Sequence, residues 1–247
     1  MKPFLILQLR VIDEAADQEF EAIMKYGGLE RNEVVRIRME KESFDSINAC
    51  DFAGIIVGGG PSNVSDDIDK KPGFQIRFEN ELDQLYASII ENDIPFFGTC
   101  YGLGSMVKYA GGIVSKEKYS EPVGYTEIHL NDDGREDPLF SGLPDSFIGF
   151  CGHKEACQTI PEEAVLLGSS DLSPVQIIRM KHNIYAVQFH CELDGPGMAK
   201  RIVYYKNHGY FDPKESEAMI RRYQNVKTEI PQIVLKRFVD RYSTKKM

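Results

Sequence analysis

Short apolar segments alternate with segments of helical spacing through the first half of the chain. Residues 74–91 carry apolar side chains at intervals of three and four, as on one face of an amphipathic helix. The apolar runs between such segments have the length and residue types of buried strands. This alternation predicts an α/β fold with a mostly parallel central sheet and helices on both faces. The predicted strands are 4–9, 34–39, 52–57 and 95–98, and the predicted helices are 14–26 and 74–91.

The pattern changes to strands and turns between about residues 113 and 193. Residues 125–130 alternate between apolar and polar, and residues 131–134 have the composition of a turn. Residues 175–180 and 184–189 flank another turn-like segment, which predicts a hairpin. Further helices are predicted over 198–206, 214–224 and 228–242. We therefore expect a single domain over 1–247, with a small antiparallel strand region and a helical C-terminal extension from about residue 198.

Composition and charge narrow the functional class. The net charge of -9 argues against a partner of duplex nucleic acid, which would normally require a basic face. No apolar run reaches membrane-spanning length, and residues 4–7 are interpreted as a first strand rather than a signal peptide, so no membrane partner is expected. The 5 cysteines form an odd set without paired spacing. We expect a protein of the reducing cytoplasm.

The most informative segment is 94–104, an apolar strand that leads into a glycine-flanked cysteine and then a short helix. A strand, a tight turn and a helix start in this order are typical of a nucleophile elbow, which exposes the sulfur of Cys100 at the carboxyl end of a sheet. The partial positive charge at the helix N-terminus favours a thiolate there. The alternative for Cys100 taken alone is a buried small hydrophobe.

A cysteine nucleophile needs a base, and the base needs a third group that fixes its orientation. His190 and Glu192 meet this requirement at the end of the predicted strand 184–189. The period of two along a strand places both side chains on the same face. Taken singly, each has a simpler interpretation, as a hydrogen-bonded core histidine and a solvated carboxylate.

The run of glycines at Gly58, Gly59 and Gly60 follows a buried strand and precedes Pro61. Glycines let backbone N–H groups come close to a substrate. One loop N–H and that of Tyr101 would stabilise the oxyanion formed by attack on an amide, each donor being worth about 3 kcal/mol. The dinucleotide fingerprint is missing here, so we expect no nucleotide cofactor.

Three ordered motifs over residues 4–200 resemble the class I glutamine amidotransferases, in particular the glutaminase part of GMP synthase and its free-standing relatives. The motifs are Gly59-Gly60-Pro61, Gly98-Thr99-Cys100-Tyr101-Gly102-Leu103-Gly104 and Gln188-Phe189-His190-Cys191-Glu192. The resemblance implies a flavodoxin-like fold and hydrolysis of glutamine or a related γ-glutamyl amide through a thioester, with release of ammonia or an amine. By the same resemblance Cys100 is the nucleophile, His190 the general base and then acid, and Glu192 the orienting carboxylate, while Gly59, Gly60 and Tyr101 form the oxyanion hole and bind substrate.

Two positions depart from the family pattern. Gly104 stands where the family has a glutamine that holds the substrate, and Cys191 replaces a proline without changing the spacing of the triad. Gly104 makes room for a bulkier γ-glutamyl compound, or else it weakens glutamine binding until a partner completes the site. The chain contains no phosphate loop of the ATP-pyrophosphatase type, so synthetase activity would require a separate subunit.

Alternatives remain open at this stage. A γ-glutamyl peptidase is a variant of the same chemistry, and a non-catalytic binding or regulatory protein would keep the fold without turnover. A hydrolase of the PfpI type is a weaker rival, because that family has histidine where Tyr101 stands. We expect no metal, since Cys50, Cys151, His153 and Cys157 lack a fourth ligand at a recognised spacing and are interpreted as buried structural residues. His129, His182 and His208 are interpreted as surface residues.

Overall fold

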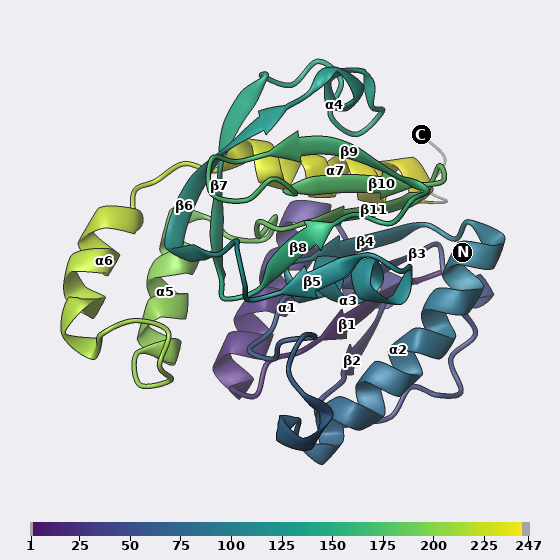
Figure 1. The fold of residues 1–247 in the computed structure, drawn as a ribbon, viewed down its shortest axis with the longest axis horizontal. Coiled ribbons are helices and arrows are strands. Elements are labelled where there is room, and N and C mark those ends of the chain that lie inside the picture. Colours follow the sequence, from purple (N-terminus) through teal and green to yellow (C-terminus); the bar gives the residue numbers. More distant parts are fainter. Residues whose placement is uncertain (1, 244–247) are drawn as a thin grey trace.

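The computed structural model describes residues 2–243, and in it a nine-stranded sheet is covered by helices on both faces (Figure 1). The strand order is β2-β1-β3-β4-β11-β10-β9-β6-β7, and β5 pairs with β8 in a separate sheet. The strands are β1 (Phe4–Gln8), β2 (Val34–Arg38), β3 (Gly54–Val57), β4 (Phe96–Thr99), β5 (Ile113–Ser115), β6 (Glu121–Leu130), β7 (Ser146–His153), β8 (Ala156–Thr159), β9 (Ala164–Ser169), β10 (Ile177–Met180) and β11 (Ile184–Val187). The α-helices are α1 (Asp13–Gly27), α2 (Gly73–Asn92), α3 (Tyr101–Tyr109), α4 (Asp132–Glu136), α5 (Gly195–Tyr205), α6 (Ser216–Tyr223) and α7 (Glu229–Tyr242).

The parallel half of the sheet has a hydrophobic core on each face. Successive residues of β1 point to opposite sides, so Phe4 and Ile6 pack with α1 and α7, and Leu5 and Leu7 pack with α2. Every residue of β1 is buried, which explains why this strand is a continuous apolar run rather than an alternating one. Strands β2, β1, β3, β4 and β11 pair in parallel, as the alternation of segments predicts.

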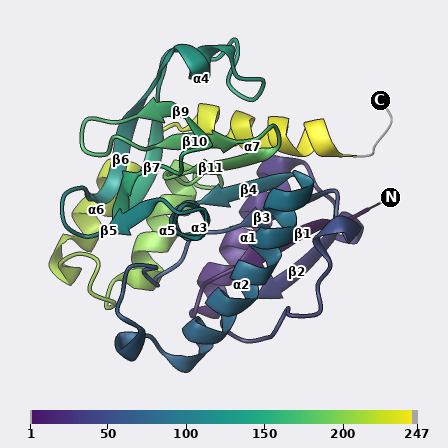
Figure 2. The same ribbon diagram turned by 45° about the vertical axis from the view of Figure 1, so that its right-hand side comes forward.

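The other half of the sheet is antiparallel and continues the same surface. β10 pairs with β11 and β9, and β6 pairs with β9 and β7. Figure 2 shows this half extending from the parallel strands toward α5 and α6. The predicted α/β class with helices on both faces and antiparallel strands is confirmed, and so is the hairpin of β10 and β11 around residues 181–183.

Three local expectations are wrong. Residues 131–134 are not a plain turn, because Asn131 caps the short helix α4 by accepting a hydrogen bond from the Gly134 N–H at 2.8 Å. The helix predicted over 214–224 is divided into a 3-10 turn at Pro213–Glu215 and α6. Cys50 is exposed, whereas Cys151 and Cys157 are buried as expected.

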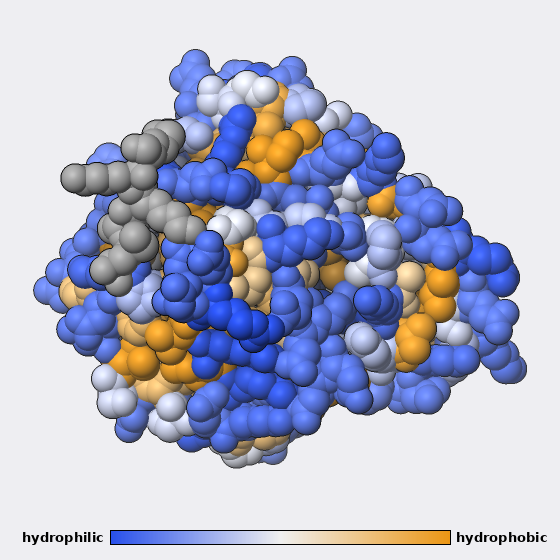
Figure 3. Space-filling view, turned by 180° about the vertical axis from the view of Figure 1, so that it is seen from behind, coloured by the Kyte–Doolittle hydropathy of each residue, from blue (hydrophilic) through white to orange (hydrophobic). Residues whose placement is uncertain are grey.

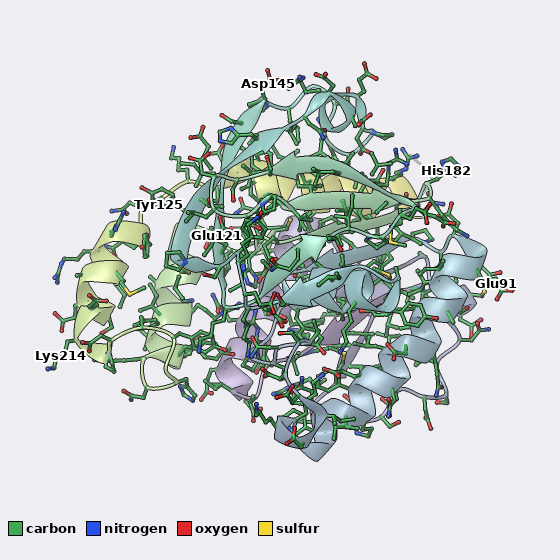
Figure 4. The ribbon with its side chains drawn as sticks, viewed as in Figure 1. Glu91, Glu121, Tyr125, Asp145, His182 and Lys214 are labelled. Carbon is green, nitrogen blue, oxygen red and sulfur yellow. The ribbon has the colours of Figure 1, made fainter. Side chains whose placement is uncertain are left out.

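The surface carries no broad apolar face in the view of Figure 3, where hydrophobic residues fall in patches separated by hydrophilic ones. Among residues 2–243 no helix combines the length and hydropathy needed to cross a membrane. His129, His182 and His208 are exposed, as predicted, and Figure 4 places His182 at the edge of the molecule.

Candidate active site

Cys100 lies at the turn between β4 and α3, near the middle of the sheet. Its backbone has φ 51° and ψ -98°, a conformation that a residue with a side chain adopts only under constraint from its surroundings. The constraint comes from close backbone packing around the turn. A Cβ on Gly98 would stand 2.7 Å from the Gly102 backbone, and one on Gly102 would stand 2.6 Å from the Val57 carbonyl oxygen. Glycine at both positions therefore lets the turn close and points the sulfur outward.

His190 and Glu192 lie beyond the end of β11 rather than within it. The strand ends at Val187, so the strand period is not what aligns the two side chains. His190 is instead fixed by an isolated bridge to β7, in which its N–H donates to the Phe150 carbonyl oxygen at 2.8 Å. The chain turns after this bridge, and the His190 Nδ1 lies 2.8 Å from the Glu192 Oε1.

The sequence thus predicted that His190 and Glu192 lie side by side, but it gave the wrong reason. The bridge to β7 and the turn after it, not the strand period, bring them together. The other edge of the His190 ring faces Cys100, whose sulfur helps to raise the pKa of the ring. Since Nδ1 is engaged by Glu192, Nε2 is the ring nitrogen that remains for the sulfur.

Charges around His190 and Glu192 support an ion pair between them. Burial alone would lower the pKa of His190, but the charge of Glu192 and the hydrogen bonds to Cys100 and Glu192 outweigh it and raise the pKa to about 9. Burial alone would raise the pKa of Glu192, but His190, Arg201 and Arg10 hold it below its usual value. Glu192 is thus a carboxylate that keeps the imidazole protonated.

Two buried arginines behind the triad were not identified from the sequence. Arg10 follows β1 and donates from Nε to Glu19 Oε2 at 2.5 Å, and Glu19 is fully buried on α1. Arg201, on α5, lies 3.8 Å from the same Glu19 oxygen and 3.7 Å from Glu192 Oε1. The carboxyl ends of parallel strands share one edge of a sheet, and that rule points to Arg10. Nothing in the local sequence points to Arg201.

The glycine loop after β3 passes directly beside the triad. The point where a Cβ on Gly59 would stand lies 2.5 Å from His190 Cε1, 3.1 Å from Arg10 Nη2 and 3.3 Å from Cys100 Cβ. A side chain on Gly59 would therefore displace the histidine. Tyr101 follows Cys100 and begins α3, so its N–H has no acceptor within the helix. The structure places Gly59, Gly60 and Tyr101 around Cys100, and their role as oxyanion donors stays a prediction.

Gly104 lines a cavity beside Cys100 and has room for a methyl group. A Cβ there would stand 3.4 Å from Val64 and 3.8 Å from Glu155 and Val114, which is ordinary contact. Glu155 accepts hydrogen bonds from the Val64 and Ser65 N–H groups at 2.8 and 2.9 Å. The space beside Gly104 is thus bounded by a loop that Glu155 holds in place.

A second histidine–glutamate pair, His153 and Glu121, lies close to the space beside Gly104. His153 Nε2 is 2.7 Å from Glu121 Oε2, and its Nδ1 is 2.8 Å from the Glu155 carbonyl oxygen. Glu121 also accepts hydrogen bonds from Ser170 and Gln176. Figure 4 shows Glu121 in the interior, while Tyr125 on the same strand points outward. Both ring nitrogens of His153 are engaged, so neither is free for a substrate.

Two cavities meet at Cys100. The larger, of about 240 Å³, is lined by Tyr101, Gly104, Lys154 and Glu155 among others. The smaller, of about 70 Å³, is lined by His190, Arg10 and Arg201 and by apolar side chains from β6 and α5. Gly60, Cys100, Gly152, Tyr205 and Tyr210 line both. Within residues 2–243 no cluster of His, Cys, Asp and Glu has the arrangement of a metal site.

The family model and the similar proteins of known sequence all point to the glutamine amidotransferases. Residues 11–228 match the model of the family described as glutamine amidotransferase class-I. The chain is 35% identical over 164 residues to a GMP synthase [glutamine-hydrolyzing] of Thermosipho africanus, a match that covers 66% of this chain and only 28% of that protein. It is 25% identical over 225 residues to a subunit of the GMP synthase [glutamine-hydrolyzing] of Thermoplasma volcanium, covering 90% of this chain and 100% of that one.

Solved structures share the fold. A glutamine amidotransferase from Thermotoga maritima superposes with a TM-score of 0.77 at 20% identity, over 97% of this chain and 99% of that one. A glutamine amido transferase from Methylobacillus flagellatus superposes with a TM-score of 0.73 at 17% identity, over 97% and 95% of the two chains. At such identities the superpositions establish the architecture and leave the chemistry to the site itself.

Proposed function

The chain belongs to the class-I glutamine amidotransferase family, and from that premise we propose that it hydrolyses glutamine or a related γ-glutamyl amide through a thioester on Cys100. The observation that carries the proposal is the position of His190, which is hydrogen-bonded to Glu192 and faces Cys100. Cys100 itself lies at a strained turn that is open to two cavities. A packed structural cysteine would need neither the strained backbone nor the access.

In the first half of the reaction, His190 Nε2 already holds the proton of the Cys100 thiol, and the sulfur attacks the amide carbon as a thiolate. A carbon–sulfur bond forms and the carbonyl oxygen takes up the negative charge. The N–H groups of Tyr101 and of the loop at Gly59 and Gly60 stabilise this oxyanion, each at about 3 kcal/mol. The intermediate collapses when His190 gives its proton to the amide nitrogen, and the carbon–nitrogen bond breaks.

In the second half, water replaces the released ammonia or amine and attacks the thioester. His190 takes a proton from that water, and collapse of the second oxyanion breaks the carbon–sulfur bond. Glu192 keeps the ring in one orientation through both halves, and its negative charge stabilises the imidazolium. The products are glutamate and a regenerated Cys100 and His190 pair.

The test is release of ammonia from glutamine, and of amines from γ-glutamyl amides, by wild type and Cys100→Ala. Turnover that depends on Cys100, and an acyl-enzyme mass after quenching in acid, are the expected results. A glutamine-like diazo-ketone should label Cys100 faster than it labels a free thiol. If no γ-glutamyl compound is turned over and labelling is no faster than for a free thiol, the chain is a non-catalytic member that keeps the fold.

A second proposal concerns the fate of ammonia. The relative from Thermoplasma volcanium is named as one subunit of its enzyme, and this chain covers its whole length, which supports a partner in the form of a separate synthetase subunit. Such a subunit should raise glutamine hydrolysis when it is added in stoichiometric amounts. An unchanged rate with the ATP-pyrophosphatase subunit of the same organism would contradict this partner.

A further inference from the structure

The small cavity lies on the leaving-group side of Cys100. His190, which must protonate the departing nitrogen, lines the small cavity and is not among the residues lining the large one. Tyr101, whose N–H would hold the oxyanion, lines the large cavity and not the small one. The glutamyl part of a substrate therefore belongs in the large cavity, and whatever is attached to its amide nitrogen enters the small one.

Three residues that line the small cavity each carry a buried polar atom with no hydrogen-bond partner among residues 2–243. The atoms are Arg10 Nη2, Arg201 Nη2 and the Tyr205 hydroxyl, in side chains that are all more than nine-tenths buried. An unpaired buried donor costs about 1–3 kcal/mol, so three around one small space are a costly arrangement unless a ligand engages them. All three can donate, and the partner that they share must be an acceptor.

The acceptor must also tolerate the charges already present. Glu19 and Glu192 each lie within 4.0 Å of a guanidinium, so neither arginine lacks a counter-ion. What the guanidiniums lack is an acceptor for their outer N–H groups. A Cβ built on Gly59 would stand 3.1 Å from Arg10 Nη2 and 3.3 Å from Cys100 Cβ, so the Arg10 guanidinium lies close to Cys100. The ligand atom therefore sits a few bonds from the scissile amide.

The rest of the small cavity is apolar. Its wall includes Val123, Leu193, Met198, Ile202 and Phe211. A volume of about 70 Å³ is several times the 10–15 Å³ that one water needs. Ammonia alone would leave both the apolar wall and the three donors unused.

We propose that the small cavity binds the leaving group of a γ-glutamyl amino acid, with the carboxylate on Arg10, Arg201 and Tyr205 and a small side chain against the apolar wall. This inference rests on the proposed function and names its substrate class. The carbon–nitrogen bond breaks as His190 protonates the nitrogen, and a free small apolar amino acid is released while Cys100 keeps the glutamyl group as a thioester.

The test uses two substrates that differ only in the carboxylate, γ-glutamyl-alanine and γ-glutamyl-ethylamide. Wild type should have a kcat/KM at least about tenfold higher for γ-glutamyl-alanine, as expected for hydrogen bonds to a charged group. Tyr205→Phe removes one donor without changing the ring and should lower this ratio several-fold. Tyr204→Phe, one position away on α5 and outside both cavities, should keep the wild-type ratio.

The outcomes separate this inference from the proposed function. Equal rates for the two substrates, with turnover dependent on Cys100, would overturn the carboxylate site and leave the hydrolase intact. If nothing is turned over, calorimetry with Cys100→Ala decides the inference alone. Tighter binding of γ-glutamyl-alanine than of γ-glutamyl-ethylamide, weakened by Tyr205→Phe, supports it, and equal binding refutes it.

Discussion

Two buried histidine–glutamate pairs lie in the described part of the chain, with nearly equal nitrogen–oxygen distances of 2.8 Å at His190 and 2.7 Å at His153. The His190 pair leaves one ring nitrogen facing Cys100, and its carboxylate lies beside Arg201. The His153 pair is closed, because a carbonyl oxygen occupies the other ring nitrogen and Ser170 and Gln176 donate to its carboxylate. The comparison shows why we assign the proposed chemistry to His190: it keeps a ring nitrogen facing Cys100, whereas both ring nitrogens of His153 are engaged.

The largest expected effect is on rate. His190→Gln should lower kcat/KM for glutamine or γ-glutamyl amides by at least about 10³-fold, because the proton carrier is lost. His153→Gln should lower it by less than about tenfold, since His153 has no nitrogen available for a substrate. Release of ammonia or amine, measured well below the unfolding temperature, checks both variants. A greater loss in His153→Gln would reverse the assignment of the two pairs.

For the free energy of unfolding we expect the opposite order, with the larger loss from substitution of His153. His153→Ala leaves the Glu121 carboxylate buried without its histidine partner, which should lower the free energy of unfolding by about 3 kcal/mol. His190→Ala should cost less, because Glu192 retains Arg201 at 3.7 Å. Urea unfolding followed by circular dichroism measures both. The exposed His182, changed to Gln, serves as the control and should shift stability by no more than about 0.5 kcal/mol.

A further test displaces the His190 ring by a substitution at Gly59 and leaves His190 itself unchanged. Gly59→Ala puts a methyl group where only 2.5 Å separates it from His190 Cε1, so the ring must shift away from Cys100. A shift of this size should lower kcat by about 10²-fold. Gly104→Ala adds a methyl group at ordinary contact distance and should change kcat less than about threefold. Equal effects in the two variants would contradict a tight fit around His190.

The smallest effect is a displacement of the pH profile. His190 must be protonated to release the amine, so kcat/KM should fall as pH rises through its pKa of about 9. Glu192→Gln removes the charge that raises this pKa and leaves the opposing effect of burial, so the alkaline limb should move down by at least about one pH unit. Glu121→Gln should leave the limb in place. An unmoved limb in Glu192→Gln would mean that another group sets it.

Local pattern was enough to predict the parallel half and the three motif residues of the candidate triad. β1 is buried on both faces and is therefore a continuous apolar run, whereas α2 is buried on one face and has helical apolar spacing. The glycines around Cys100 indicated the elbow. Residues 131–134 were predicted as a turn, whereas Asn131 caps the helix α4. Asparagine is common both in turns and at helix N-caps, so the local sequence did not distinguish the two. Arg10 and Arg201 are far apart in sequence, and charged side chains usually belong to the surface, so only the folded chain reveals that they meet at Glu19.

The parallel pairing of β4 with β11 has a consequence for how the protein is made. Phe96 pairs with Ile184 and Thr99 with Val187, so the strand that carries the nucleophile cannot be completed by anything earlier in the chain on that side. About 90 residues separate Cys100 from His190, and at 5–20 residues per second the ribosome needs roughly 4 to 18 seconds to add them. Throughout that interval the Cys100 thiol of the nascent chain lacks His190 beside it, so the proposed reactivity requires that β11 has joined the sheet.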